Sequence, residues 1–99
     1  MGYKIKWLHE ASTTYLDEIE FIFLKWNQSE TEKFIYLADD NLKRLTVNPF
    51  IGKPIKSYYK LVISKQTTLY YKVIENKKQI HLLVFWNNLK NPDDLAKLL

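Results

Sequence analysis

The stretches KLVIS (residues 60–64), TTLYYKVIE (67–75) and QIHLLVFW (79–86) decide the fold that this sequence predicts. They are rich in Val, Ile, Leu and aromatic residues, and only two or three polar residues separate one stretch from the next. Such runs with short polar breaks are typical of consecutive strands joined by tight turns. The second half of the chain therefore predicts an antiparallel meander of three strands.

A short helix is predicted directly after the meander. Asn91 is suited to cap its N-terminus, and Pro92 is suited to its first position, where a helix does not need the missing N–H group. Asp93 and Asp94 then lie in the first turn, where the positive end of the helix dipole favours carboxylates.

The first half of the chain begins with a strand and continues with a helix. Residues 3–8 alternate apolar side chains with lysines, which predicts a half-buried strand. From about residue 10 to residue 27 the spacing becomes helical. The expected buried stripe consists of Leu16, Ile19, Ile22, Phe23 and Trp26, whereas Asp17, Glu18 and Glu20 are expected to point elsewhere. Phe21 and Leu24 lie off this stripe, so they either pack within the fold or form a docking surface.

A second helix is predicted from a capping box, with Ser29 as the N-cap and Glu32 reaching back to it. The helix is expected to end near residue 47, because Pro49 disfavours helical backbone in the residue before it. Its predicted buried residues are Phe34, Leu37, Ala38, Leu42 and Leu45. The two helices then form an antiparallel hairpin, and residues 49–57 form an ordered connector.

The composition indicates one globular domain over residues 1–99, with element order β-α-α-β-β-β-α and an α+β fold. Hydrophobic residues make up 46% of the chain, which excludes a disordered protein. Cysteine is absent, which excludes disulfides and thiolate chemistry. No apolar run is long enough to span a membrane and the first residues do not resemble a signal peptide, so a cytoplasmic protein is expected.

The net charge of +4 is unevenly distributed along the chain. Residues 1–48 contain six basic and eight acidic groups, whereas residues 49–99 contain nine basic and three acidic groups. A basic field on one part of a small domain favours an acidic protein or a nucleic acid as partner, and a solvated lysine-rich face is the alternative interpretation.

Element order and three motifs resemble the RelE/ParE superfamily of toxins from bacterial type II toxin–antitoxin pairs, including proteins of the plasmid stabilisation type. The motifs are NPFIGKP (48–54) after the second helix, LYYKV (69–73) in a central strand and VFW (84–86) at the end of the last strand. The resemblance covers essentially the whole chain. It implies a helical hairpin packed on a small antiparallel sheet.

The resemblance also implies a function and a partner. Such a toxin arrests growth when free and is neutralised by a co-encoded acidic antitoxin, whose C-terminal segment wraps the hairpin and covers the sheet. A toxin–antitoxin hetero-oligomer is therefore expected, without a cofactor or a metal. His9 and His81 are expected to be structural, because no carboxylate–histidine cluster at ligand spacing accompanies either of them.

Two modes of attack are implied, and they use different residues. A RelE-like toxin cleaves mRNA on the ribosome with basic residues of the sheet, which in this chain correspond to Lys60, Lys72 and Lys90. The arginine expected in the central strand falls on Thr68, and the basic pair expected after the last strand falls on Asn87 and Asn88. Most of the RNA-cleaving set is therefore missing.

A ParE-like toxin inhibits DNA gyrase by binding it and needs a surface rather than catalytic groups. The long hairpin, of roughly forty residues, favours this mode. RNA cleavage and a non-toxic protein-binding module remain the alternatives, so enzymatic activity is left open. The residues expected to contact antitoxin or target are Phe21, Leu24, Lys60, Lys65, Tyr71, Lys72, Trp86, Asn88 and Lys90. Tyr70 and Tyr71 must face opposite sides of their strand, so one of the two is expected in the core.

Overall fold

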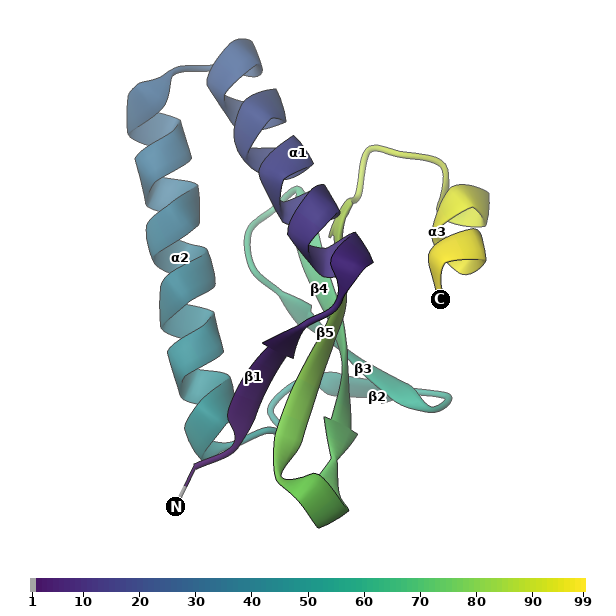
Figure 1. Ribbon diagram of the computed structural model, residues 1–99. Coiled ribbons are helices and arrows are strands. Elements are labelled where there is room, and N and C mark those ends of the chain that lie inside the picture. The colour runs from purple at the N-terminus through teal and green to yellow at the C-terminus, as the bar shows by residue number, and fades with distance from the viewer. Residues whose placement is uncertain (1) are drawn as a thin grey trace.

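The computed structural model describes residues 2–99 and contains three helices and a five-stranded sheet (Figure 1). The elements in chain order are β1 (Lys4–Trp7), α1 (His9–Lys25), α2 (Gln28–Val47), β2 (Lys53–Ile55), β3 (Tyr58–Val62), β4 (Thr67–Ile74), the 3₁₀ turn η1 (Glu75–Lys77), β5 (Gln79–Asn87) and α3 (Pro92–Leu98). The helical hairpin, the β3–β4–β5 meander and the final helix are confirmed. α3 begins as predicted, with Pro92 in its first turn and the Asn91 side chain accepting a hydrogen bond from the Asp93 N–H.

The sheet has the order β1-β5-β4-β3-β2 and is mixed rather than purely antiparallel. β1 pairs in parallel with β5, which corrects the expected antiparallel sheet. The helical hairpin separates β1 from the meander, so no tight turn forces the two strands into opposite directions. The predicted connector also contains an unexpected strand, β2, at the sheet edge, where Pro54 does not break an internal ladder.

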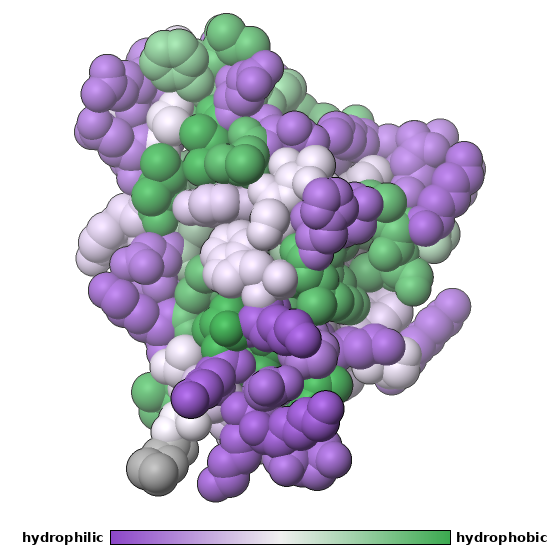
Figure 2. All heavy atoms as spheres, in the orientation of Figure 1, coloured by the Kyte–Doolittle hydropathy of each residue, from purple (hydrophilic) through white to green (hydrophobic). Residues whose placement is uncertain are grey.

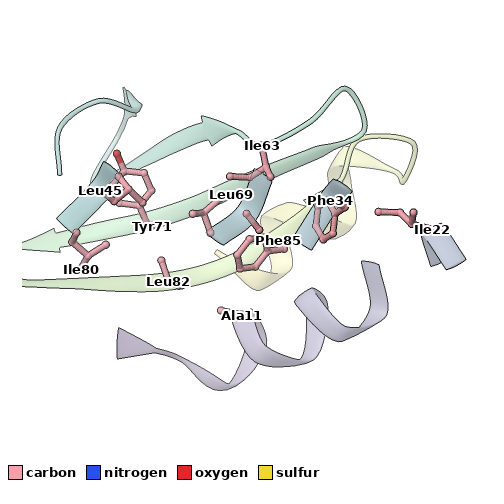
Figure 3. Close-up of a cluster of buried hydrophobic side chains, with 11 residues drawn as sticks. Ala11, Ile22, Phe34, Leu45, Ile63, Leu69, Tyr71, Ile80, Leu82 and Phe85 are labelled. Atoms are coloured by element: carbon pink, nitrogen blue, oxygen red, sulfur yellow. The ribbon is translucent and has the colours of Figure 1, made fainter. Parts of the chain in front are cut away.

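The helical hairpin covers one face of the sheet, and the hydrophobic core lies between them (Figures 1 and 3). The fully buried residues of the core include Ala11, Leu45, Leu69, Tyr71, Ile80 and Leu82. Removing an aliphatic side chain of leucine size from water contributes roughly 1.5–3 kcal/mol, so this layer accounts for much of the stability. No helix among residues 2–99 has the length and hydropathy needed to cross a membrane.

The buried stripe of α1 differs from the predicted one. Ala11, Glu18 and Ile22 face the sheet, whereas Leu16 is 64% exposed and Phe23 is 52% exposed. The prediction assigned the largest apolar side chains to the core, but the stripe that packs inward carries a carboxylate. Glu18, which was expected to point elsewhere, is therefore a buried polar residue.

The N-cap of α2 lies two residues earlier in the chain than predicted. Asn27, not Ser29, is the N-cap, and its side-chain oxygen accepts a hydrogen bond of 2.9 Å from the Glu30 N–H. Phe34, Ala38 and Leu45 are buried as predicted, whereas Leu37 is 39% exposed. The asparagine that ends the α1–α2 turn thus satisfies the first free N–H groups of the helix, which is the role expected of an N-cap.

Tyr71 fixes the connector after α2 to the central strand. Its hydroxyl donates to the Pro49 carbonyl and accepts from the Gly52 N–H, both at 2.9 Å. The side chain is fully buried, and burial raises the pKa of its hydroxyl. Tyr71, which was predicted to contact a partner, is thus buried in the core, and its neighbour Tyr70 is the tyrosine on the opposite face.

Candidate functional site

The sheet face opposite the hairpin carries rows of cationic and aromatic side chains. His81 of β5 pairs with Lys6 of β1 on one side and with Lys72 of β4 on the other. In the next row Lys60 of β3 pairs with Tyr70 of β4. Because side chains alternate between the two faces of a strand, residues opposed in this way point to the same side. We call this surface the open face.

One end of the open face is covered by the chain after β5. α3 contacts β5 on the side away from the hairpin (Figure 1), and both Val84 and Trp86 are buried. The Lys90 ammonium group lies 5.8 Å from the centre of the Trp86 ring, a cation–π distance. Trp86, predicted as a partner contact, is thus only 6% exposed and lies beneath Lys90.

At this covered end two of the three positions expected to hold basic residues form a neutral hydrogen-bonded pair. The Thr68 hydroxyl donates to the Asn88 side-chain oxygen at 3.1 Å. The Asn88 N–H donates to the Gln66 carbonyl at 2.7 Å, which fixes the loop after β5 to the β3–β4 turn. The arrangement can orient a loop, but Thr68 and Asn88 supply no positive charge to a phosphate.

The third such position, Asn87, belongs to a buried polar cluster that was not predicted. Glu18 of α1 accepts hydrogen bonds from the Thr67 hydroxyl and from the Asn87 amide, the latter at 2.9 Å. Asn87 in turn accepts from the Leu89 N–H at 2.9 Å. This chain of contacts connects the middle of α1 to the loop that carries Lys90. The amphipathic pattern of α1 gave no signal for it.

The lysines of the sheet have no carboxylate partners within residues 2–99. The three ion pairs of the described chain each lie within one helix: Glu30–Lys33, Asp39–Lys43 and Asp94–Lys97. Burial, followed by the charges of Lys6, Lys77 and Lys72, lowers the pKa of His81. The electrostatic character of the open face is therefore positive and uncompensated.

The hairpin side presents a different surface. A groove of about 440 Å³ lies between β1, α1 and α2, and its apolar lining consists of Trp7, Tyr15, Ile35, Tyr36 and Leu42. Glu32 and Asp39 also line it. Figure 2 shows hydrophobic side chains running from the top of the molecule through its centre, with hydrophilic side chains on both flanks and at the bottom. We call this cavity the hairpin groove.

The predicted site residues do not converge on one place. Lys60 and Lys72 share the open face, whereas Lys90 and Asn88 lie on the loop beyond β5. Lys65 is exposed in the β3–β4 turn.

The two apolar residues predicted on α1 have different environments. Phe21 is half-buried against the core, and Leu24 is 73% exposed. The residues that sequence reasoning missed are Lys6, Tyr58 and those of the hairpin groove. The alternation of lysines in β1 hinted at Lys6. Among residues 2–99 no group of three or more His, Cys, Asp or Glu side chains could hold a metal ion.

The fold of this chain is similar to that of solved toxins from toxin–antitoxin systems. The chromosomal ParDE toxin–antitoxin system from P. aeruginosa matches with a TM-score of 0.71 and 16% identity, over 86% of this chain and 95% of that chain. The isolated E. coli RelE toxin matches with a TM-score of 0.57 and 17% identity, over 98% of this chain and 99% of that chain. The intact E. coli RelBE toxin–antitoxin complex matches with a TM-score of 0.55 and 19% identity, over 86% of this chain and 95% of that chain.

These matches show that the chain has the RelE/ParE fold. The sequence itself matches no protein-family model and no curated protein.

Proposed function

We propose that this protein is the toxin of a type II toxin–antitoxin pair and acts as a ParE-like binding inhibitor of DNA gyrase. It is growth-inhibiting when free and is held inactive by a co-encoded antitoxin. The proposal rests on the RelE/ParE fold, whose solved examples include a ParDE system and a RelBE complex. A cytoplasmic location and a single domain over residues 1–99 accompany it.

The Thr68–Asn88 pair is the observation that carries the choice of a binding mechanism. Cleavage of RNA requires cations where negative charge develops on the phosphate, and preorganised donors provide most of that stabilisation. Here a neutral hydroxyl and a neutral amide bond to each other at 3.1 Å, and Asn87 is turned inward to Glu18. The neutral side chains at the Thr68–Asn88 end of the sheet therefore favour binding of a target over cleavage of RNA.

Lys60 and Lys72 favour a second candidate, a RelE-like ribosome-dependent endoribonuclease. Both lie on the open face, where they can approach RNA phosphates, and Lys90 lies beyond the end of β5. A lysine supplies a point charge but not the bidentate fork of an arginine. A non-toxic protein-binding module, which binds a partner and inhibits nothing, is the third reading.

Inducing the chain alone in a bacterial host separates these readings. We expect pulse-labelled DNA synthesis to fall within minutes, before protein synthesis falls, because an inhibited gyrase stops replication first. In the Lys60→Ala/Lys90→Ala variant, any inhibition that remains should still affect DNA synthesis before protein synthesis. An early loss of protein synthesis that this variant abolishes would instead establish the endoribonuclease reading, and unchanged growth would leave only the binding module.

The hairpin groove is the place where we expect the antitoxin to anchor an apolar segment. Large apolar side chains in a desolvated groove dominate the affinity of such interfaces. Ile35→Asp/Tyr36→Asp should weaken capture by the product of the adjacent reading frame by at least about 2 kcal/mol, the range of hot-spot residues. Titration calorimetry of the purified proteins measures this change.

Val47→Asp provides the matched control for this experiment. Val47 is 83% exposed on the same helix but lies outside the groove. If Val47→Asp weakened antitoxin binding as much as the groove variant does, the antitoxin would not be anchored in the groove. The same conclusion would follow if the groove variant left the affinity unchanged.

A further inference from the structure

The hairpin groove differs from most of the molecular surface in the sign of its charge. Glu32 and Asp39 are the charged residues of its lining, and both are exposed. Most of the basic groups lie elsewhere: residues 49–99 contain nine basic and three acidic groups, whereas residues 1–48 contain six basic and eight acidic ones. The groove therefore combines apolar walls with negative charge in a protein whose net charge is +4.

Both acidic residues of the groove lie on one stripe of α2. Glu32 and Asp39 are seven residues apart, which is about two turns and roughly 10 Å along a helix. Ile35 and Tyr36 lie between them in the same lining, with exposed fractions of 39% and 70%. The stripe thus places one negative charge on each side of an exposed apolar pair.

The two carboxylates are free to pair with a partner. Within residues 2–99 Glu32 forms no ion pair, and its side-chain oxygen accepts a hydrogen bond of 3.2 Å from the neutral Gln28 amide. Asp39 pairs with Lys43 at 3.1 Å, but both side chains are mostly exposed, and such surface pairs are weak. The charge of Asp39 also acts inside the groove, because burial and then this carboxylate raise the pKa of Tyr15.

The length of the groove suits a helical segment. A second hollow of about 470 Å³ shares Glu32 and Tyr36 with the groove and continues it to Ser29, near the start of α2 (Figure 1). Leu42 lines the other end. The distance from Ser29 to Leu42 is about 20 Å at the helical rise of about 1.5 Å per residue, which equals almost four turns of a second helix. Amphipathic helices bind such apolar grooves through anchors spaced at i, i+3, i+4 and i+7.

We propose that the hairpin groove takes a basic amphipathic helix of the antitoxin, with lysines or arginines paired to Glu32 and Asp39 and apolar residues packed on Ile35 and Tyr36. The inference rests on the proposed function for the identity of the occupant and adds the sign of its charge. The acidic character expected of the antitoxin then belongs to other parts of it, which can cover the lysines of the open face. An acidic helix in the groove would face like charges, which oppose binding.

Two synthetic peptides of about 14 residues test the sign of the charge directly. Both are held helical by a hydrocarbon staple and carry the same central leucine pair, with two lysines flanking the pair in one peptide and two glutamates in the other. We expect the lysine peptide to bind on the order of tenfold more tightly at low salt, because two attractive ion pairs replace two repulsive ones. The preference should shrink at about 1 M salt, where charges are screened within about 3 Å. Equal affinities at low salt, or a preference for the glutamate peptide, would overturn the inference.

Neutralising the two carboxylates locates the preference. In Glu32→Gln/Asp39→Asn the lysine peptide should bind more weakly and the glutamate peptide more tightly, so that their affinities differ by less than about threefold. A merely damaged groove would weaken both peptides. Asp17→Asn/Glu20→Gln is the matched control, because it removes the same charge from exposed positions of α1 outside the groove. The control should keep the preference, and an equal loss in it would reduce the effect to net charge and overturn the site.

Failure of this inference and failure of the proposed function give different results. Equal binding of both peptides by a chain that stops DNA synthesis when induced would overturn the basic occupant and leave the toxin assignment intact. A lysine preference in a chain that leaves growth unchanged would support a basic occupant and overturn the proposed function. Sedimentation of the chain alone tests a second copy as the occupant: we expect a monomer, and a dimer that Ile35→Asp/Tyr36→Asp dissociates would overturn the antitoxin helix.

Discussion

Replacing Gly52 by alanine should lower the free energy of unfolding by about 2–4 kcal/mol, because a β-carbon at this position has no room. It would lie 2.5 Å from the Tyr71 hydroxyl oxygen and 2.8 Å from the Lys60 carbonyl oxygen. The carbonyl belongs to a paired strand and the tyrosine is fully buried, so neither can move without breaking other contacts. Chemical denaturation followed by circular dichroism measures the loss.

A double-mutant cycle with Tyr71→Phe separates this clash from a general backbone effect. Tyr71→Phe alone removes two hydrogen bonds, which should cost about 1–3 kcal/mol. In the Gly52→Ala/Tyr71→Phe variant the closest clashing atom is gone, so the combined loss should be smaller than the sum by about 1 kcal/mol or more. Strict additivity would show that the Tyr71 hydroxyl does not limit the space at Gly52. Ser57→Ala, in the exposed turn between β2 and β3, should have little effect.

Glu18→Ala should destabilise the protein by about 2–4 kcal/mol, because two buried donors then lose their acceptor. The Thr67 hydroxyl and the Asn87 amide both donate to this carboxylate in the native fold. Truncation also leaves a void between α1 and the sheet, which adds a cavity cost. Glu20→Ala, two residues along the same helix and exposed, provides the control and should change the free energy of unfolding by less than about 0.5 kcal/mol.

Glu18→Gln distinguishes hydrogen bonding from charge. The glutamine oxygen can accept from Asn87 while its amide donates to the Thr67 hydroxyl, so the variant should retain most of the stability. Because Asn87 holds the Leu89 N–H, amide hydrogen exchange at Leu89 should quicken in Glu18→Ala and stay slow in Glu18→Gln. An Ala variant as stable as the Glu20 control would mean that this network contributes nothing.

The fold and the Thr68–Asn88 end have different implications for function. A RelE/ParE fold does not fix the chemistry, because function depends on the groups at the site. In this chain the neutral Thr68–Asn88 pair argues for binding, whereas the lysine rows provide an uncompensated positive surface.

The sequence alone determined the order of the elements and most of their limits. The β3–β5 meander, the hairpin and the Asn91–Pro92 start of α3 were predictable, because alternation, helical spacing and caps act over a few residues. It also located the basic half of the chain. Strand β2 was missed because a run of three residues containing Pro54 shows no period.

Only the tertiary structure decided which side chains meet. The parallel pairing of β1 with β5 brings Lys6 to His81, although 74 residues lie between them in the chain. The register of β4 against β5 turns Tyr71 inward and Tyr70 outward, and the packing of α1 buries Glu18 against Asn87. A shift of one residue in a strand exchanges its two faces, and local patterns do not specify that shift between strands distant in the chain. Local sequence patterns therefore determine where the strands of the meander lie in the chain. The open face, in contrast, exists only because strands that are distant in the chain pair with one another.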